Sequence, residues 1–547
     1  MSPETTKEGT GMETQTRRTT GWAVIETLRG YGVDTVFGIP GTHNLEFYRP
    51  LPALGVHPVT TRHEQGAGYA ADGWSLQTGM PGVVITTSGP GLLNALSAAG
   101  TAYCESRPMI LLAPGPARGH EFADAGTLHE TKDQLSAASA IVEWGRRVQS
   151  AEEAVEAVHD AFALFATGRP RPVYIEVPLD LLEEEEAELS PEVVAPRRPA
   201  DVPTPDSAAI VEAARLLAAA SDPVILAGGG SRSATVELRA LAERLGAPVV
   251  TTLNAKGVLD EHHPLSLGAN LRLAAARNRA RDADVLLVVG SKLGEAELWV
   301  EKLEARGRVI RIDVLESQLD KNQPAEIGIV ADAAAALAAL AEALGTGEPS
   351  TDARMEETLA AVAAECAALS PINTAIADAI AETLPADAIV TTDSSQIGYW
   401  GLLNRLRVAT PNSTPYMATY ATLGYGLPAA IGSRIAAPHR SVFAVVGDGA
   451  LMFSLQEFMT VVEQRLDITV IVVDNGGYAE IKQNEADAGI APIGVDLAQP
   501  DWAALAAAFG GTGHRVRSAG ELARAVAVAS GAGGLHLIHL PQSDFTE

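Results

Sequence analysis

Short apolar runs alternate with amphipathic stretches along most of the chain. Runs such as 82–87, 109–114 and 172–178 are rich in Val, Ile and Leu and are bounded by Gly, Pro or Ser. Longer segments between such runs, for example 21–32, place apolar residues at helical spacing. Strands that alternate with helices predict parallel sheets with helices packed on both faces. We therefore expect an α/β protein made of doubly wound parallel-sheet domains.

The alternation occurs in three blocks, which we interpret as three domains at residues 17–182, 207–345 and 370–543. The segment 183–206 separates the first two, because its run of Glu and its prolines cannot form a core element. A second polar segment, 347–357, separates the second block from the third. The strand-like runs are 34–39, 82–87, 109–114 and 172–178 in the first block, 223–230, 247–253, 284–290 and 308–314 in the second, and 388–393, 441–449, 468–475 and 535–540 in the third.

Composition and charge exclude several classes of function. Of the 547 residues 47% are hydrophobic, enough for several buried cores, and the formal net charge is −28. This charge argues against nucleic acid as a partner, because such binding requires a basic surface. The two cysteines, Cys104 and Cys366, form no CxxC motif, which argues against a disulfide framework and a zinc ribbon. Their scarcity fits a reducing compartment.

The chain has no sequence feature that predicts a membrane partner. No apolar stretch approaches the roughly 20 residues that are needed to cross a bilayer. Residues 1–18 are polar and lack the apolar segment of a signal peptide, so we interpret them as a disordered lead-in. We therefore expect a cytoplasmic protein.

Polar residues end two consecutive apolar strands of the third block. Asp448 follows the strand 441–447 and lies between two glycines, and Asn475 follows the strand 468–473. One helical segment, 454–466, connects them, so the two strands form a βαβ unit whose carboxyl ends meet at one edge of the sheet. Carboxylate and amide oxygens suit Mg²⁺ or Ca²⁺, and Mg²⁺ usually needs phosphate oxygens to complete its shell. The sequence therefore predicts a metal-bound diphosphate, which Gly449 and the following helix N-terminus allow to approach closely.

This arrangement resembles the thiamine diphosphate motif, in which GDG is followed by an Asn at the end of the next strand. The resemblance implies that Mg²⁺ is held by Asp448, by the side chain of Asn475 and by the backbone carbonyl of Gly477. The usual pair of Asn residues is Asp474–Asn475 here. Because side chains alternate along a strand, we expect Asp474 to face away from the metal.

Further segments extend the resemblance over the whole chain. Residues 61–75, 86–96 and 420–432 are similar to segments of acetolactate synthases and benzoylformate decarboxylases. The three blocks would then be the pyrimidine-binding, middle and diphosphate-binding domains. In this superfamily the two halves of a site come from different subunits. The resemblance thus implies a homodimer as the minimum active unit and a homotetramer as the expected assembly.

The resemblance also implies roles for individual residues. Glu64 would hydrogen-bond the cofactor's pyrimidine ring and start the proton transfers that activate the thiazolium carbon. Leu423 would lie under the bent cofactor, and the residues after strand 388–393 would contact the diphosphate. The expected cofactor-binding residues are Glu64, Ser394, Ser395, Gln396, Leu423, Gly447, Asp448, Gly449, Ala450, Asn475, Gly477 and Tyr478.

The class of reaction follows from the cofactor that the resemblance implies. A 2-oxo acid substrate would lose CO₂ and leave an enamine, which is either protonated to an aldehyde or captured by a second carbonyl compound. Residues 267–299 lack the stretch that contacts the flavin in acetolactate synthases, so we expect no FAD. The glycine-rich turn 226–234 is not followed by the acidic residue of a dinucleotide site, so we interpret it as a tight turn.

A carboligase similar to acetolactate synthase stays open as an alternative. A cofactor-binding protein without activity is a third hypothesis, against which the presence of Glu64 speaks.

Two histidines and one carboxylate are candidates near the substrate. His43 and His129 lie in loops that border the site in the family and are candidate proton relays, although an isolated His is often structural. The segments 37–51 and 476–496 resemble 5-guanidino-2-oxopentanoate (2-ketoarginine) decarboxylases. Glu480 would then pair with the guanidinium of the substrate, with Asp487 and Glu485 as second choices. The alternative for Glu480 is a first-turn carboxylate that only the helix dipole favours.

Overall fold

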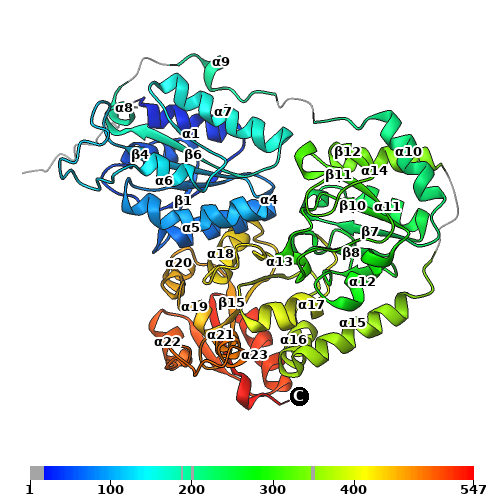
Figure 1. The fold of residues 1–547 in the computed structure, drawn as a ribbon. Coiled ribbons are helices and arrows are strands. Elements are labelled where there is room, and N and C mark those ends of the chain that lie inside the picture. The colour runs from blue at the N-terminus through cyan, green and yellow to red at the C-terminus, as the bar shows by residue number, and fades with distance from the viewer. Residues whose placement is uncertain (1–17, 186–188, 199–201, 346–350, 547) are drawn as a thin grey trace, which may run out of the picture.

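The computed structural model describes residues 18–185, 189–198, 202–345 and 351–546. The start of the first predicted domain, Arg17, and most of the predicted lead-in at 1–18 lie outside the described residues. Three parallel sheets, each covered by helices, make up three lobes (Figure 1). This confirms the predicted α/β class and the three parallel-sheet domains.

The first sheet has the strand order β2–β1–β3–β4–β6–β5. Helices α4, α5 and α6 cover one face, and α1, α2, α3, α7 and α8 cover the other, so alternate residues of each inner strand enter two different cores. The strands are β1 (Thr35–Gly38), β2 (His57–Thr60), β3 (Gly82–Ile85), β4 (Met109–Gly115), β5 (Trp144–Arg147) and β6 (Pro172–Pro178). The helices are α1 (Thr20–Gly30), α2 (Leu45–Tyr48), α3 (Leu51–Leu54), α4 (Glu64–Thr78), α5 (Pro90–Glu105), α6 (Gln134–Ser139), α7 (Ala151–Thr167), α8 (Leu179–Glu183) and α9 (Pro191–Val194).

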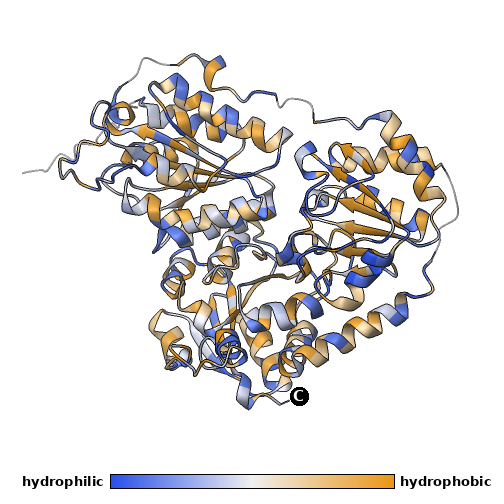
Figure 2. Cartoon of the chain, in the orientation of Figure 1, coloured by the Kyte–Doolittle hydropathy of each residue, from blue (hydrophilic) through white to orange (hydrophobic). Residues whose placement is uncertain are grey.

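The middle sheet has the order β12–β11–β10–β7–β8–β9. Its central strand β10 is hydrophobic and buried throughout, as expected for a strand that is covered on both faces (Figure 2). The strands are β7 (Pro223–Ala227), β8 (Val249–Thr251), β9 (Ser266–Gly268), β10 (Val285–Val289), β11 (Arg308–Asp313) and β12 (Ile327–Val330). The helices are α10 (Ser207–Ala218), α11 (Thr235–Leu245), α12 (Ala274–Asp282), α13 (Glu295–Leu298), α14 (Ala333–Leu344) and α15 (Met355–Leu369).

The third sheet has the order β13–β14–β15–β17–β16. Helices α18, α20 and α22 pack on one face, and α16 and α23 on the other. The strands are β13 (Ile389–Thr392), β14 (Val442–Gly447), β15 (Ile468–Asp474), β16 (Thr512–Arg515) and β17 (Leu535–Pro541). The helices are α16 (Pro371–Thr383), α17 (Leu403–Arg405), α18 (Gly426–Ala436), α19 (Asp448–Leu451), α20 (Phe458–Glu463), α21 (Ala479–Asp487), α22 (Trp502–Ala508) and α23 (Ala519–Ala532), with a π-helix, η4 (Ile397–Leu402).

The first and third domains share one hydrophobic core, because α4 crosses α18 at very short range (Figure 1). The crossing requires a residue without a side chain at Gly432, where a Cβ atom would lie 1.8 Å from the carbonyl oxygen of Ala70. The same close approach occurs at Gly73, on the facing helix. Gly73 and Gly432, which lie in the segments 61–75 and 420–432 that extend the family resemblance, therefore serve the packing of one domain on the other.

A buried ion pair joins the same two domains. The guanidinium of Arg107, two residues after the end of α5 in the first domain, donates to Asp72, to the Tyr425 hydroxyl at 3.0 Å and to the Tyr416 carbonyl. Its side chain is 3% exposed and that of Asp72 is 2% exposed. Removing one member of such a pair leaves an uncompensated buried charge.

We expect the substitution Arg107→Leu to destabilise the protein by about 3–5 kcal/mol, because it leaves the Asp72 carboxylate buried in the interdomain core without its cationic partner. Urea unfolding followed by tryptophan fluorescence measures the loss. Arg306→Leu is the control, since Arg306 is exposed and pairs with Asp282 at the surface, where a pair contributes about 0–1 kcal/mol. Equal small losses in both variants would contradict a structural role for the buried pair.

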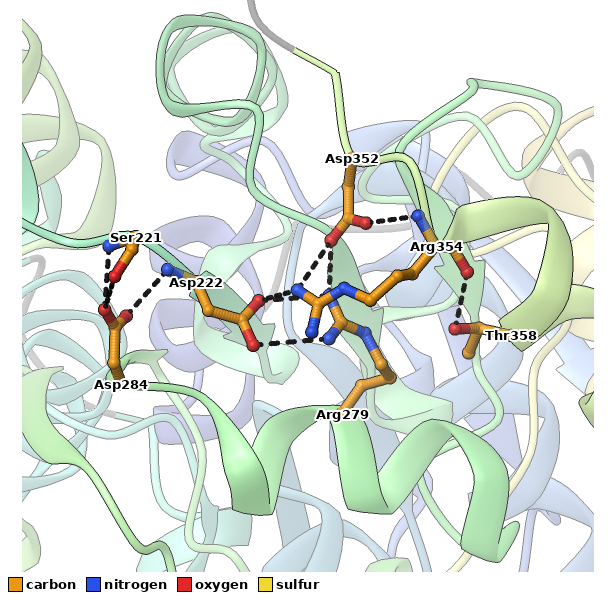
Figure 3. Close-up of polar contacts among 7 residues, drawn as sticks. All are labelled: Ser221, Asp222, Arg279, Asp284, Asp352, Arg354 and Thr358. Atoms are coloured by element: carbon orange, nitrogen blue, oxygen red, sulfur yellow. Dashed lines mark hydrogen bonds and ion pairs between the residues drawn. The ribbon is translucent and has the colours of Figure 1, made fainter.

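A second charge cluster fixes the chain where it leaves the middle domain. Arg279 on α12 and Arg354 both pair with Asp222, and both also contact Asp352 (Figure 3). Asp284 supports Asp222 by accepting its backbone N–H at 3.0 Å. The cluster holds the start of α15 against α12, so α15 packs on the middle domain.

Of the helices in the described ranges, none is by itself long and apolar enough to cross a bilayer; α15 and α16 reach that length only as a pair, with a bend of 119° between them.

Candidate active site

The candidate site begins where β14 and β15 end. The two strands are parallel neighbours in register from Val442↔Ile468 to Gly447↔Val473, so their carboxyl ends lie at one edge, as predicted. Asp448 begins α19 directly after β14 and is almost fully buried. Its carboxylate accepts the backbone N–H of Asn475 at 3.4 Å. Between the strands the chain forms α19, a 3₁₀ turn and the short α20 rather than one continuous helix.

The side-chain amide of Asn475 faces two other oxygens. One of its two terminal amide atoms points toward both of them and lies 3.2 Å from Asp448 Oδ1 and 3.2 Å from the carbonyl oxygen of Gly477. Gly477 has φ of +136°, and a Cβ atom there would lie 2.2 Å from the Val495 carbonyl oxygen, so only glycine directs its carbonyl to this point. One carboxylate, one amide and one carbonyl form a donor set that suits Mg²⁺. Among the described residues, no group of three His, Cys, Asp or Glu side chains is placed to bind a metal.

Two further side chains define the surroundings of Asp448. Gln499 donates from Nε2 to Asp448 Oδ2 at 2.6 Å, a contact that the sequence did not indicate, because Gln499 belongs to no recognisable motif. Asp474 turns away, as expected, and its carboxylate lies 2.8 Å from His539 Nε2. Burial, and then the charge of Asp474, raise the pKa of Asp448 above its ordinary value.

The other residues predicted to bind the diphosphate surround this edge. A Cβ atom at Gly447 would lie 2.9 Å from Ser395 Cβ, and one at Gly449 would lie 2.9 Å from the Tyr478 ring. Both glycines thus lie directly beneath neighbouring side chains. The remaining predicted residues nearby are Ser394, half-buried after β13, Ala450, buried in α19, and Leu423, half-buried in the loop before α18. Gly424 next to Leu423 lies against Phe453, which follows α19.

Glu64 is the first residue of α4 and lies among residues of the first domain. Its carboxylate accepts Asn94 Nδ2 at 3.0 Å. Burial, and then the charge of Glu64, raise the pKa of the Tyr48 hydroxyl. Glu457 of the third domain accepts the backbone N–H of Arg62 at 3.1 Å and so fixes the segment that precedes Glu64. Sequence reasoning missed Glu457, because its role depends on the contact between two domains.

The two candidate histidines lie together. The rings of His43 and His129 have centroids 5.2 Å apart in an edge-to-face arrangement. His43 Nδ1 lies 2.7 Å from Ser88 Oγ, and His129 Nδ1 lies 3.3 Å from Thr87 Oγ1. Burial, and then the His129 ring, lower the pKa of His43 below its ordinary value. The segment that carries Thr87 and Ser88 leads into α5, the helix of Asn94, so the pair belongs to the same part of the first domain as Glu64.

Glu480 lies in the first turn of α21 and is tied to the third-domain site. Its Oε2 atom accepts Trp400 Nε1 and Gln396 Nε2, each at 3.1 Å. The π-helix η4 carries Trp400 and Tyr399, and π-helical turns often occur at functional sites. Burial, and then the charge and hydrogen bond of Glu480, raise the pKa of the Tyr399 hydroxyl above its usual range. The Trp400 ring also lies 4.7 Å from the Trp299 ring of the middle domain.

The second-choice carboxylates have other neighbours. Asp487, exposed at the end of α21, accepts Gln483 Nε2 at 2.8 Å. Glu485 accepts the backbone N–H of Ile493 at 3.2 Å. Glu480, by contrast, bonds both Gln396 and Trp400. This favours Glu480 as the charge nearest the site.

A separate cavity of about 390 Å³ lies between the middle domain and the first domain. It is bordered by the turn after β7, by the segment after β10 and by residues of the first domain. Burial lowers the pKa of Lys292 in its wall to about 8 and raises that of Glu297 to about 7. The predicted absence of FAD concerns the middle domain and stays a prediction.

Comparison with known proteins agrees with this geometry. Models of the thiamine pyrophosphate enzymes match the chain in three parts: the N-terminal TPP binding domain at 18–137, the central domain at 210–340 and the C-terminal TPP binding domain at 393–540. The probable 2-ketoarginine decarboxylase AruI of Pseudomonas aeruginosa is 38% identical, with 97% of this chain and 95% of that protein covered. The acetolactate synthase large subunit of Parasynechococcus marenigrum is 32% identical (93% and 85% covered), and isozyme 1 of Escherichia coli is 31% identical (85% and 83% covered).

Proposed function

We propose a reaction for this chain from one premise: the chain belongs to the thiamine pyrophosphate enzyme family. A relative that is 38% identical over nearly the whole chain is named as a decarboxylase, and the chain is accordingly a thiamine diphosphate-dependent carboxy-lyase. Its proposed substrate is 5-guanidino-2-oxopentanoate (2-ketoarginine). The proposed products are 4-guanidinobutanal and CO₂, formed without oxidation.

The surroundings of Glu480 carry the substrate proposal. Its carboxylate is held in place by Trp400 and Gln396, next to the strand ends that carry Asp448 and Asn475. A guanidinium binds a carboxylate through charge-assisted hydrogen bonds and also stacks on aromatic faces. The rings of Tyr399, Trp400 and Trp299 supply such faces beside the carboxylate. An anionic or purely apolar substrate side chain would gain nothing from this charge.

The proposed metal and cofactor fit the residues that are present. Asp448, Asn475 and the Gly477 carbonyl supply three oxygens that face one another, and these would hold Mg²⁺. When bound, thiamine diphosphate supplies the carbon nucleophile and the electron sink that decarboxylation requires. Glu64 would hold a proton shared with the pyrimidine ring, and His43 and His129 would move protons at the substrate. Apolar surroundings favour loss of the substrate's carboxylate charge.

The proposed assembly is a homodimer at minimum, in which Glu64 of one subunit completes the site that contains the partner's Asp448. Within the described part of one chain, Glu64 and Asp448 share no hydrogen-bond partner. Apolar side chains are left exposed near both halves of the site, as at an interface: Leu93, Tyr420, Met452, Phe453 and Met459. A homotetramer, a cytoplasmic location and a place in arginine catabolism complete the proposal.

A substrate panel tests the proposed function. We expect CO₂ release from 2-ketoarginine to exceed that from pyruvate, benzoylformate and branched 2-oxo acids, because only the first presents a cation to Glu480. The measurement is kcat/KM for each acid. The substitution Glu480→Gln should lower kcat/KM for 2-ketoarginine much more than for the neutral acids. A preference for an anionic or apolar acid would contradict the guanidino assignment.

The carboligase alternative gains weight from the acetolactate synthases among the relatives. It predicts a chiral hydroxyketone from pyruvate, which chiral chromatography of the products detects. Formation of the aldehyde alone, in the same reaction, supports the decarboxylase.

The histidine pair gives a separate prediction. We expect His43→Gln to lower kcat by about 100-fold while cofactor affinity is unchanged, because the ring would move a proton and not hold the cofactor. The pKa of His43 is lowered, so the neutral ring prevails at neutral pH. If a neutral His43 is required, kcat of the wild type should decrease as the pH drops through this pKa. The kcat of His43→Gln should not show that decrease. His57→Gln, at an exposed His that contacts Gln464, is the control.

A further inference from the structure

We propose that Glu480 also has a second role, in which it sets, through Gln396, the orientation of the Asn475 amide for metal binding. The inference rests on the proposed cofactor and its metal ion, but not on which 2-oxo acid is the substrate. It concerns three side chains of the third domain, from α21, from the residue before η4 and from the residue after β15. In this arrangement Gln396 is a positioning residue.

A chain of hydrogen bonds connects the three side chains. Gln396 Nε2 donates to Glu480 Oε2 at 3.1 Å, and Asn475 Nδ2 donates to Gln396 Oε1 at 3.3 Å. An ionised carboxylate only accepts hydrogen bonds, so the NH₂ group of Gln396 must face Glu480. Its oxygen must then face Asn475, and this requires the NH₂ group of Asn475 on that side. The charge of Glu480 therefore fixes both amides.

The orientation of the Asn475 amide determines which of its atoms faces Asp448 and Gly477. Its oxygen is left facing Asp448 Oδ1 and the Gly477 carbonyl, each at 3.2 Å. Three acceptors without a donor between them are unfavourable, whereas a cation among them satisfies all three. A reversed amide would instead donate to Asp448 and Gly477 and would lose its bond to Gln396. Because the hydrogen-bond network decides amide orientation, the Glu480–Gln396 chain keeps Asn475 in the form that a metal requires.

Breaking the chain should weaken metal binding. In Glu480→Gln, the new amide can donate to Gln396, so both neighbouring amides can reverse and Asn475 can donate to Asp448. A metal ion must then displace those bonds before it can bind. In Gln396→Met, the side chain keeps its length but both bonds are lost. Loss of an outer-shell partner of this kind typically lowers metal affinity by about 10- to 100-fold.

The test uses Mn²⁺ as the probe, with thiamine diphosphate present and substrate absent. Free Mn²⁺ is measured by electron paramagnetic resonance during titration of the full-length protein. We expect Glu480→Gln and Gln396→Met each to bind Mn²⁺ about 10-fold or more weakly. The double variant should bind no more weakly than the weaker single variant, because both substitutions break one chain. Asp487→Asn removes the same charge from the same helix outside this chain and should keep wild-type affinity.

Two results would overturn the inference. One is unchanged Mn²⁺ affinity in both single variants, even if their activity is lost. The other is an additive loss in the double variant, which would show two independent effects. An error in the proposed substrate would give a different result. The substrate panel would then show a preference for another 2-oxo acid, while the variants would still show the expected Mn²⁺ affinities.

Discussion

The substitution Glu64→Gln is expected to lower kcat for decarboxylation by about 100- to 10,000-fold, the usual contribution of a positioned acid or base. Glutamine keeps the size of the side chain and an oxygen that can still accept Asn94 Nδ2, which lies 3.0 Å from the carboxylate. It removes the ionisable group that would share a proton with the cofactor. Affinity for Mg²⁺ and thiamine diphosphate should stay within a few-fold of wild type, because the proposed metal ligands belong to the third domain and Glu64 belongs to the first.

The measurement separates these two quantities. Steady-state CO₂ release gives kcat, and quenching of tryptophan fluorescence gives cofactor affinity. Exchange of the cofactor's C2 proton for deuterium, followed by NMR, reports on the activation step directly. Glu356→Gln, an exposed carboxylate in the first turn of α15, is the matched control. Equal losses of turnover and cofactor affinity in Glu64→Gln would show that Glu64 is structural.

The sequence predicted the inner strands of each sheet but not most edge strands. The apolar runs correspond to β1, β3, β4 and β6, to β7, β8, β10 and β11, and to β13, β14, β15 and β17. Each of the five remaining strands, β2, β5, β9, β12 and β16, lies at an edge of its sheet. An edge strand contacts only one neighbour, and four of these five have partly exposed residues, so the apolar run that identifies a buried strand is missing.

In the candidate site, too, the sequence predicted residues that a local pattern specifies and missed residues whose contacts are distant in sequence. Asp448 and Asn475 were predictable together, because a βαβ unit brings consecutive strand ends to one edge. Gln499 and Glu457 were not, since each reaches its partner through a loop or a domain contact that no local pattern specifies. A glycine in a family segment need not serve the cofactor. Gly432 belongs to the segment 420–432 that resembles the family, but it packs against Ala70. The chain from Glu480 to Asn475 required side-chain geometry.

The effect expected of Asp448→Ala is different in kind from that of Glu64→Gln, because it removes the only charged oxygen of the proposed metal site. A neutral amide and a carbonyl alone hold Mg²⁺ poorly, so metal-dependent retention of thiamine diphosphate should be abolished. A ligand at 100 times its Kd stabilises a native protein by about 2.7 kcal/mol, and the variant should lose this stabilisation. Thermal unfolding with and without Mg²⁺ and thiamine diphosphate measures the difference, and gel filtration followed by cofactor assay measures retention. Asp474→Asn is the matched control, since that carboxylate lies 2.8 Å from His539 Nε2 and is not one of the proposed metal ligands. Full cofactor-dependent stabilisation of Asp448→Ala would place the metal elsewhere.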